Sequence, residues 1–306
     1  MNQTAENSPS PRDRASSRGN PRSGDAQREE TQREDPPSEP CHVGIVFALS
    51  QESGGLIDRL AGSIDTVAAG FKIREGGLAG RRVAAIVSGS GRKAAARAAE
   101  MLIAGHDPQW IISSGFAGGL VESIARGDIV AANEIVAAKD TVTAGNTANA
   151  TTNDAAVESA SHSGDQRIVV DVPAELAALL VADHIGRFVT VDAIVTTPAR
   201  KRELAEAHGA IAVDMESLAV AEVCRREQRR FLAIRIVSDA VDDELPEEVS
   251  NLIKQKSLAA QFGAVAGALF KRPSSIKDLY RLKENALLGS DQLAKFLETV
   301  IANLKY

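Results

Sequence analysis

Two apolar runs in the second half of the chain each end at a carboxylate. Ala212-Val213 precedes Asp214 and Glu216, and the run 231–238 precedes Asp239. A buried parallel strand ends in this way where its carboxyl edge forms the floor of a ligand crevice. We therefore expect the two carboxylates to lie on neighbouring strands and to face one crevice, in which one holds a substrate and the other donates a proton.

Glu216 lies where a strand passes into a helix, and two interpretations fit it. The partial positive charge at a helix N-terminus favours a carboxylate there in any protein. The same field predicts that Glu216 is ionised, and an ionised carboxylate can accept two hydrogen bonds from a cis-diol such as that of ribose. Met215 beside it could pack against a sugar ring.

Asp239 is a candidate proton donor. The helix that follows has its own start at residues 243–246, with proline in its first turn, so Asp239 is not needed as a cap. A carboxyl in a partly dry crevice can protonate a leaving group. Glu52 follows the first predicted strand, where a solvated residue of a first helical turn and a catalytic carboxylate fit equally well.

Composition limits the class of protein. The chain has 306 residues and a net charge of -6. Residues 1–40 hold almost no large apolar residue and are predicted to be disordered, which leaves 41–306 as one catalytic domain. No run is long enough to span a membrane, and no basic face predicts nucleic-acid binding. Two cysteines fit a reducing cytoplasm, and the histidine spacing predicts no metal site and no cofactor.

Periodicity predicts strands that alternate with helices. A loop is expected at 141–166, and a turn at 115–119 is expected to end the strand before it. The predicted strands cover 42–48, 71–80, 81–88, 110–114, 186–195, 210–213 and 231–238, with an apolar stretch at 127–138. The predicted helices cover 51–60, 93–104, 173–183, 198–208 and 215–227. This order predicts an α/β three-layer sandwich with a central, mostly parallel mixed sheet.

The turn at residues 89–94 has the loose pattern G-x-G-x-x-A of dinucleotide-binding proteins. The acidic residue expected at the end of the next strand is absent, because Asp107 precedes that strand. The turn could present backbone N–H groups to an anion, and a plain tight turn fits equally well. A dinucleotide-dependent oxidoreductase is therefore disfavoured.

With these elements placed, residues 42–270 resemble the nucleoside phosphorylase / 5′-methylthioadenosine–S-adenosylhomocysteine nucleosidase superfamily. The resemblance rests on six motifs in the order of the family: 44–46 with Glu52, 88–91, 114–120, 127–130, 213–216 and 237–239. It implies a homodimer and a small-molecule nucleoside as substrate.

The resemblance also implies a role for each matching position. Asp239 matches the general acid that protonates the purine at N7, and Glu52 matches the carboxylate that orients the attacking water. Further positions match the residues that bind the substrate: Glu216 and Met215 at the ribose, Ala117 and Gly118 at the base and sugar, and Ser238 and Ile194. Ile194 stands where the nucleosidases have an aromatic residue that stacks on adenine, and Phe116 is a candidate to replace that stacking.

The resemblance leaves the reaction open between two branches of the family. Phosphorylases carry a Gly-Asp-Pro turn and an arginine for phosphate, whereas this chain has residues 47–50 there and Glu52 would repel an anion. Hydrolysis of a 5′-substituted adenosine, with release of adenine, is therefore favoured, and Arg92 keeps phosphorolysis as an alternative. Motifs at 192–201 and 271–275 are similar to hopanoid-associated members, which leaves adenosylhopane as a possible substrate. A nucleoside-binding protein without catalysis is the non-enzymatic alternative.

Overall fold

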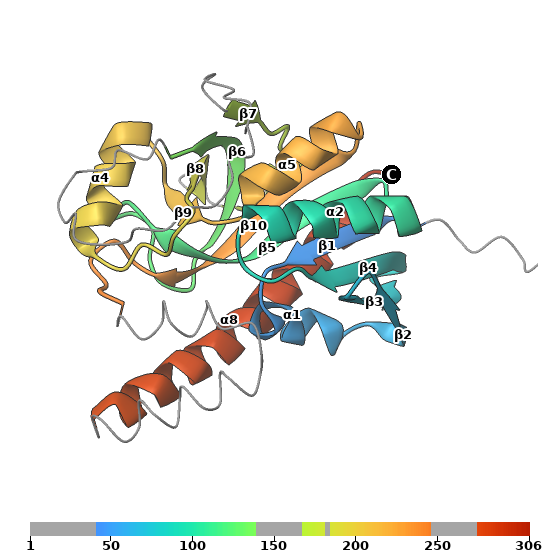
Figure 1. Cartoon of the computed structure of the whole chain (residues 1–306), viewed down its shortest axis with the longest axis horizontal. Helices are drawn as coiled ribbons and strands as arrows, with labels where there is room; N and C mark the ends of the chain where they lie inside the picture. Colours follow the sequence, from blue (N-terminus) through green and yellow to red (C-terminus); the bar gives the residue numbers. More distant parts are fainter. Residues whose placement is uncertain (1–40, 139–166, 181–183, 246–273) are drawn as a thin grey trace, which may run out of the picture. The chain divides into compact units, whose positions relative to one another are not determined.

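The computed structural model describes residues 41–138, 167–180, 184–245 and 274–306, with 274–285 described by their backbone (Figure 1). The predictions of a disordered segment at 1–40, of a loop at 141–166 and of a helix that begins near Pro246 lie outside these residues. The described part contains one sheet of ten strands with helices packed on it.

The centre of the sheet is parallel. Strand β1 (Val43–Phe47) lies between β4 (Arg81–Val87) and β5 (Trp110–Gly119), and β10 (Arg230–Asp239) pairs with the other side of β5, all in parallel. At one edge, β3 (Phe71–Leu78) and β2 (Ala61–Ala68) continue the sheet in antiparallel pairing. Residues at the carboxyl ends of β1, β5 and β10 are therefore brought to the same edge of the sheet.

The other half of the sheet closes on itself. β10 pairs with β6 (Ile129–Ala137), β6 with β8 (Ile185–Thr190), β8 with β9 (Ala212–Asp214), and β9 returns to β5. The short strand β7 (Arg167–Val169) pairs with β6. The sequence predicted that β9 and β10 are neighbouring strands. In the structure they do not pair with each other but flank β5 on either side, so both strands that lead to a carboxylate pair with β5.

Helices cover both faces of the central strands (Figure 1). α1 (Ser50–Ile57) packs against α8 (Ser274–Asn303) on one face, and α2 (Arg92–His106) packs against α5 (Ser217–Arg226) on the other. Alternate residues of β1 belong to the two apolar cores: Ile45 packs in the core that includes α8, and Val46 in the core that includes α2. The three-layer α/β architecture is confirmed.

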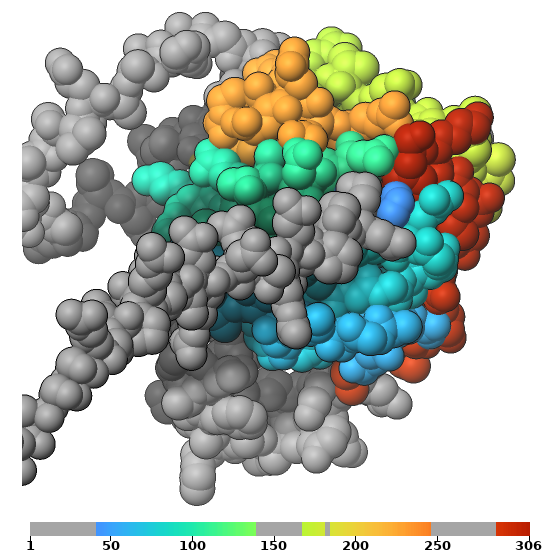
Figure 2. All heavy atoms as spheres, turned by 90° about the vertical axis from the view of Figure 1, so that its right-hand side faces the viewer, coloured from blue at the N-terminus to red at the C-terminus, as the bar shows by residue number. Residues whose placement is uncertain are grey.

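The chain returns to the start of the sheet after α8. The carbonyl of Lys305 accepts hydrogen bonds from Trp110 Nε1 (3.0 Å) and from Arg230 (2.9 Å). The guanidinium of Arg81 lies 4.4 Å from the ring centre of Tyr306. Figure 2 shows this end of the chain (red) on the surface beside the strands of the first half (blue to cyan). The last helix is therefore fixed to the sheet at its far end.

Several predicted elements are confirmed, among them the hairpin β3–β4. Helix α4 (Pro198–His208) has the predicted bounds, because Thr197 caps its N-terminus and Gly209 adopts the left-handed conformation that ends it.

Three predicted elements are wrong in extent. The helix predicted at 173–183 is a single turn, α3 (Ala174–Ala177), of which only Leu176 is buried, so packing supports no longer helix among the described residues. The strand predicted at 186–195 ends at Thr190, since its partner β9 ends opposite at Asp214. The turn predicted at 115–119 is strand, because β10 pairs with β5 as far as Gly118. The exposed edge strand β2 carries no apolar alternation and was not predicted.

Candidate functional site

Glu52 lies in the first turn of α1 and is held by three backbone N–H groups. Its Oε2 accepts from Ala48 (2.9 Å) and Leu49 (2.8 Å), and its Oε1 accepts from Phe116 of β5 (2.9 Å). The carboxylate lies directly against Gly115, where an added Cβ would meet Oε1 at 2.6 Å. The side chain is 5 % exposed, and this burial raises the pKa of Glu52. A carboxylate so oriented, with a raised pKa, is suited to accept a proton.

Glu216 precedes α5 and is 9 % exposed. Its Oε1 accepts a hydrogen bond from the backbone N–H of Gly91 (2.8 Å). Burial first, and then the neighbouring charge of Asp214, raise the pKa of Glu216 to about 7. The sequence predicts that Glu216 is ionised, and burial opposes this ionisation by moving its pKa to about 7. The charge of Glu52 also raises the pKa of Glu216, so the two carboxylates interact electrostatically.

A buried cation lies behind these two carboxylates. Arg235 of β10 is 2 % exposed, and its Nη2 donates to Asp214 Oδ2 at 2.7 Å and to the hydroxyls of Ser113 and Ser217, each at 2.9 Å. Its positive charge opposes the rise in the pKa of Glu52 and of Glu216. Nη1 of the same guanidinium is buried without a hydrogen-bond partner among the described atoms.

Sequence reasoning missed Arg235. The signal was present, because an arginine in the centre of the apolar run 231–237 can only be buried if a carboxylate pairs with it. The unpartnered nitrogen points to a ligand or water as its partner.

Asp239 ends β10 and is 3 % exposed. Its Oδ1 accepts from the hydroxyl of Ser238 at 2.5 Å, and that hydroxyl also lies 3.3 Å from the carbonyl of Ala117. Its Oδ2 lies against Gly118, 3.2 Å from the position of an added Cβ. Nζ of Lys201 lies 2.5 Å from Oδ2 and forms a buried ion pair with it.

The three predicted carboxylates are thus gathered around one strand. Glu52 lies against Gly115, and Asp239 lies against Gly118, three residues further along β5. Glu216 follows the neighbouring strand β9, and its carboxylate interacts electrostatically with that of Glu52. All three carboxylates therefore lie around the carboxyl end of β5.

The remaining predicted residues surround this centre less closely. Met215 is half-buried and packs against the apolar cluster that includes Val213, and Ile194 is half-buried between β8 and α4. The ring of Phe116 lies on the α8 side of the sheet, with Cε1 3.5 Å from the position of an added Cβ on Gly289. Its contact is thus with α8, and stacking of Phe116 on a base stays a prediction, as do the roles of Met215, Ile194, Ser238, Ala117 and Gly118.

The glycine-rich turn binds a carboxylate of the protein itself, since Gly91 N–H donates to Glu216. The next residue, Arg92, is engaged as well. Its Nε lies 3.1 Å from a carboxylate oxygen of Asp192, and its Nη2 donates to the carbonyl of Thr190 at 3.0 Å. In this arrangement both groups connect protein segments rather than presenting an anion site.

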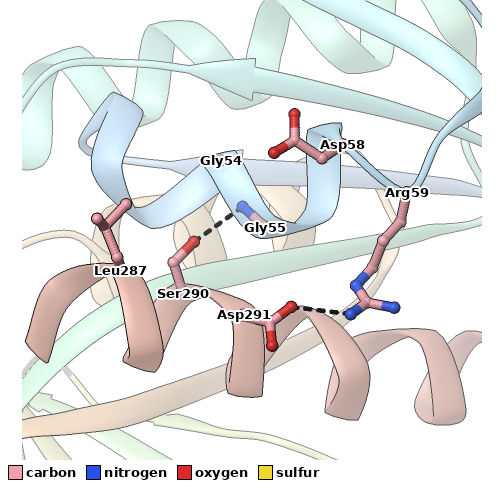
Figure 3. Close-up of a pocket in the computed structure, with 7 residues that line it drawn as sticks. All are labelled: Gly54, Gly55, Asp58, Arg59, Leu287, Ser290 and Asp291. Carbon is pink, nitrogen blue, oxygen red and sulfur yellow. Dashed lines mark hydrogen bonds and ion pairs between the residues drawn. The ribbon is translucent and has the colours of Figure 1, made fainter. Parts of the chain in front are cut away.

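Helix α8 supports α1 from behind (Figure 3). The hydroxyl of Ser290 donates to the carbonyl of Glu52 (3.2 Å) and accepts from the N–H of Gly55 (2.9 Å). Arg59 pairs with Asp291 at 2.8 Å. A hollow of about 460 Å³ lies between the two helices. It is lined by Gly54, Gly55, Asp58, Arg59, Leu287, Ser290 and Asp291 and includes none of the three carboxylates.

Comparison with known proteins shows the family of the chain. Residues 42–269 match the family model described as the phosphorylase superfamily. The chain belongs to the phosphorylase superfamily. The resemblance inferred from the six motifs is confirmed, as is the fold class. No helix in the described part of this superfamily member is long and apolar enough to cross a membrane.

Relatives within the superfamily carry a common name. The 5′-methylthioadenosine/S-adenosylhomocysteine nucleosidase of Shewanella piezotolerans is 29% identical over 226 residues, which cover 73% of this chain and 97% of the relative. That of Shewanella pealeana is 30% identical over 213 residues, covering 69% and 91%.

Solved structures share the fold. The nucleosidase of the same name from S. pneumoniae, with the transition-state inhibitor MT-ImmA, has a TM-score of 0.63 at 21% identity, covering 86% of this chain and 100% of that one. The nucleosidase from Neisseria meningitidis, in complex with methylthio-immucillin-A, has a TM-score of 0.61 at 22% identity, covering 86% and 99%.

Proposed function

We propose that this protein hydrolyses the N-glycosidic bond of a 5′-substituted adenosine, of the 5′-methylthioadenosine or S-adenosylhomocysteine type, and releases adenine. The observation that carries the proposal is the placement of Glu52 and Asp239 against Gly115 and Gly118 of one strand, with Glu216 beside Glu52. The relatives at about 30% identity bear the name of this activity, which supports it.

The first step is protonation of the leaving base. Asp239 gives its proton to N7 of adenine, the bond between C1′ and N9 breaks, and the electron pair of that bond stays on adenine, which leaves as a neutral molecule. The ribose acquires oxocarbenium character as the bond breaks. Ser238 holds one oxygen of Asp239 during this step.

The second step is attack by water. Glu52 takes a proton from the water while the water oxygen forms a bond to C1′, which gives a 5-substituted ribose. The three backbone N–H groups fix the direction of Glu52, and the unpartnered Nη1 of Arg235 supplies a further donor near it. Such positioning removes much of the entropic cost of bringing water and sugar together.

Glu216 is assigned to the ribose diol. Gly91 already donates to Oε1, so the proposal places the 2′ and 3′ hydroxyls at Oε2. Because the pKa of Glu216 is about 7, the carboxylate needed as acceptor is fully formed above neutral pH.

Hydrolysis is preferred to phosphorolysis on two observations. Glu52 is the group that the proposal places beside the attacking water, and its charge would disfavour a phosphate there. Arg92, the candidate phosphate ligand, is bound to Asp192 and Thr190. A cytoplasmic location and a homodimer remain part of the proposal.

The test is release of free adenine from methylthioadenosine, adenosylhomocysteine, adenosine, inosine and a lipid-linked adenosine, with and without phosphate. We expect adenine and a free sugar at a rate independent of phosphate. A phosphate-dependent rate with ribose 1-phosphate as product would show a phosphorylase. Tight binding of these nucleosides without any base release would show an inactive binding protein.

Asp239→Asn supplies the matched test of mechanism. It should lower kcat by at least a thousandfold, because the amide carries no acidic proton, while thermal unfolding still shows one cooperative transition. Asp242→Asn, on an exposed carboxylate three positions further, is the control and should leave kcat within twofold of the wild type. Near-normal activity of Asp239→Asn would refute the assigned role.

A further inference from the structure

Lys201 of α4 is a fully buried lysine whose ammonium contacts three oxygens. Its side chain is 0% exposed. Nζ donates to the carbonyl of Ala240 (2.6 Å) and to the carbonyl of Asp243 (2.9 Å), and it lies 2.5 Å from Oδ2 of Asp239. A buried ammonium is costly unless oxygens surround it in this way. The lysine therefore needs an explanation beyond packing.

The segment after β10 is held in place without Lys201. Ala240 N–H donates to Oδ2 of Asp243 (2.7 Å), and Leu245 N–H donates to the carbonyl of Thr196 just before α4 (2.9 Å). Arg126 pairs with Asp243 at 2.9 Å. Replacing a buried ion pair by apolar side chains is often neutral for stability. Stability is thus a weak reason for a lysine at this position.

The geometry at Asp239 indicates another reason. Ser238 holds Oδ1, and the ammonium holds the carboxylate from the side of α4. Oδ2 lies beside Gly118, on the strand that carries the other predicted base and sugar contacts. Both oxygens of the carboxyl are therefore held, Oδ1 by the hydroxyl of Ser238 and Oδ2 by the ammonium of Lys201.

We propose that Lys201 is a positioning residue, whose ammonium, anchored on the carbonyls of Ala240 and Asp243, fixes the carboxyl of Asp239 through Oδ2, beside Gly118, where the proposed function places the leaving base. The inference rests on the proposed function. The three oxygens that the ammonium contacts all belong to the protein. Its effect on the reaction passes through Asp239, both by holding the carboxyl in one rotamer and by placing a positive charge beside it.

The experiment compares Lys201→Met, Lys201→Arg and the control Arg202→Met, at an exposed neighbour on the same helix whose partner is Asp242. The kcat and KM of adenine release from methylthioadenosine are measured, with thermal unfolding of each variant. We expect Lys201→Met to lower kcat by about 10- to 100-fold with KM within threefold. Lys201→Arg should recover part of kcat, and the control should match the wild type.

The outcomes separate this inference from the proposed function. If the wild type releases adenine and a folded Lys201→Met keeps the wild-type kcat, the inference is overturned while the function stands. If Lys201→Met does not fold, Lys201→Arg decides: a wild-type kcat, in spite of the displaced cation, would overturn the inference. If the wild type releases no base from any nucleoside, the proposed function fails and this inference fails with it.

Discussion

Glu216→Gln tests the electrostatics of the site most directly, because the variant removes one titration and keeps the shape. The pKa of Glu216 rises from 4.5 in the unfolded chain to about 7 in the folded protein. The folded state therefore binds this proton more tightly. The stability that results is fully present below pH 4.5 and is lost as the pH rises through 7.

The two pKa values set the magnitude. Between pH 5 and pH 8, wild-type stability should fall by about 2.5 kcal/mol through this group alone. Glutamine does not titrate, and its side-chain oxygen can still accept from Gly91 N–H. From pH 5 to pH 8, the unfolding free energy of Glu216→Gln should therefore rise by about 2.5 kcal/mol relative to that of the wild type.

The assay is urea denaturation of both proteins at pH 5 and pH 8. Glu203→Gln, on an exposed carboxylate of α4, is the control and should follow the wild type at both pH values. If the gap between Glu216→Gln and the wild type is the same at pH 5 and pH 8, the burial of Glu216 does not have the assigned effect. In the wild type, KM is expected to rise as the pH falls below about 7, because a protonated Glu216 accepts fewer hydrogen bonds.

Two further changes probe the supports of the site. Arg235→Met should destabilise the protein by about 3–5 kcal/mol, since it leaves the charge of Asp214 buried and unpaired. The control Arg226→Met, at an exposed ion pair, should cost less than about 1 kcal/mol in the same urea titration. An equal loss of stability in both variants would contradict the role of burial. Gly115→Ala should lower kcat at least tenfold, because its Cβ would meet Oε1 of Glu52 at 2.6 Å. Its loss of stability should be smaller than that of Arg235→Met. Unchanged kinetics would show that Glu52 can move without consequence.

Local signals in the sequence predicted much of the fold. Helix α4 has its own start and stop residues, Thr197 and Gly209, and its predicted bounds were correct. The hairpin β3–β4 and the buried strand β1 follow from patterns within ten residues. The predicted ends of strands were wrong where pairing with a distant strand determines them. β5 continues to Gly119 because β10 and β9 pair with it, and no local pattern contains that information.

The residues of the site also divide into those that local patterns predict and those that depend on distant partners. The carboxylates could be predicted because each follows an apolar run, so that strand direction alone brings Glu52, Glu216 and Asp239 to one edge of the sheet. The cations could not be placed, because Lys201 finds its partner 38 residues away and Arg235 lies inside an apolar run. The raised pKa of Glu216 could not be predicted, since the depth of its burial depends on tertiary packing.

The bond between Ser290 and the main chain of Glu52 also bears on biosynthesis. Ser290 lies 238 residues after Glu52 in the sequence, so α1 is synthesised long before the residue that supports it. A nascent chain therefore holds Glu52 without this support until Ser290 has left the ribosome. A chain that is cut before Ser290 should be inactive even where its central strands have formed.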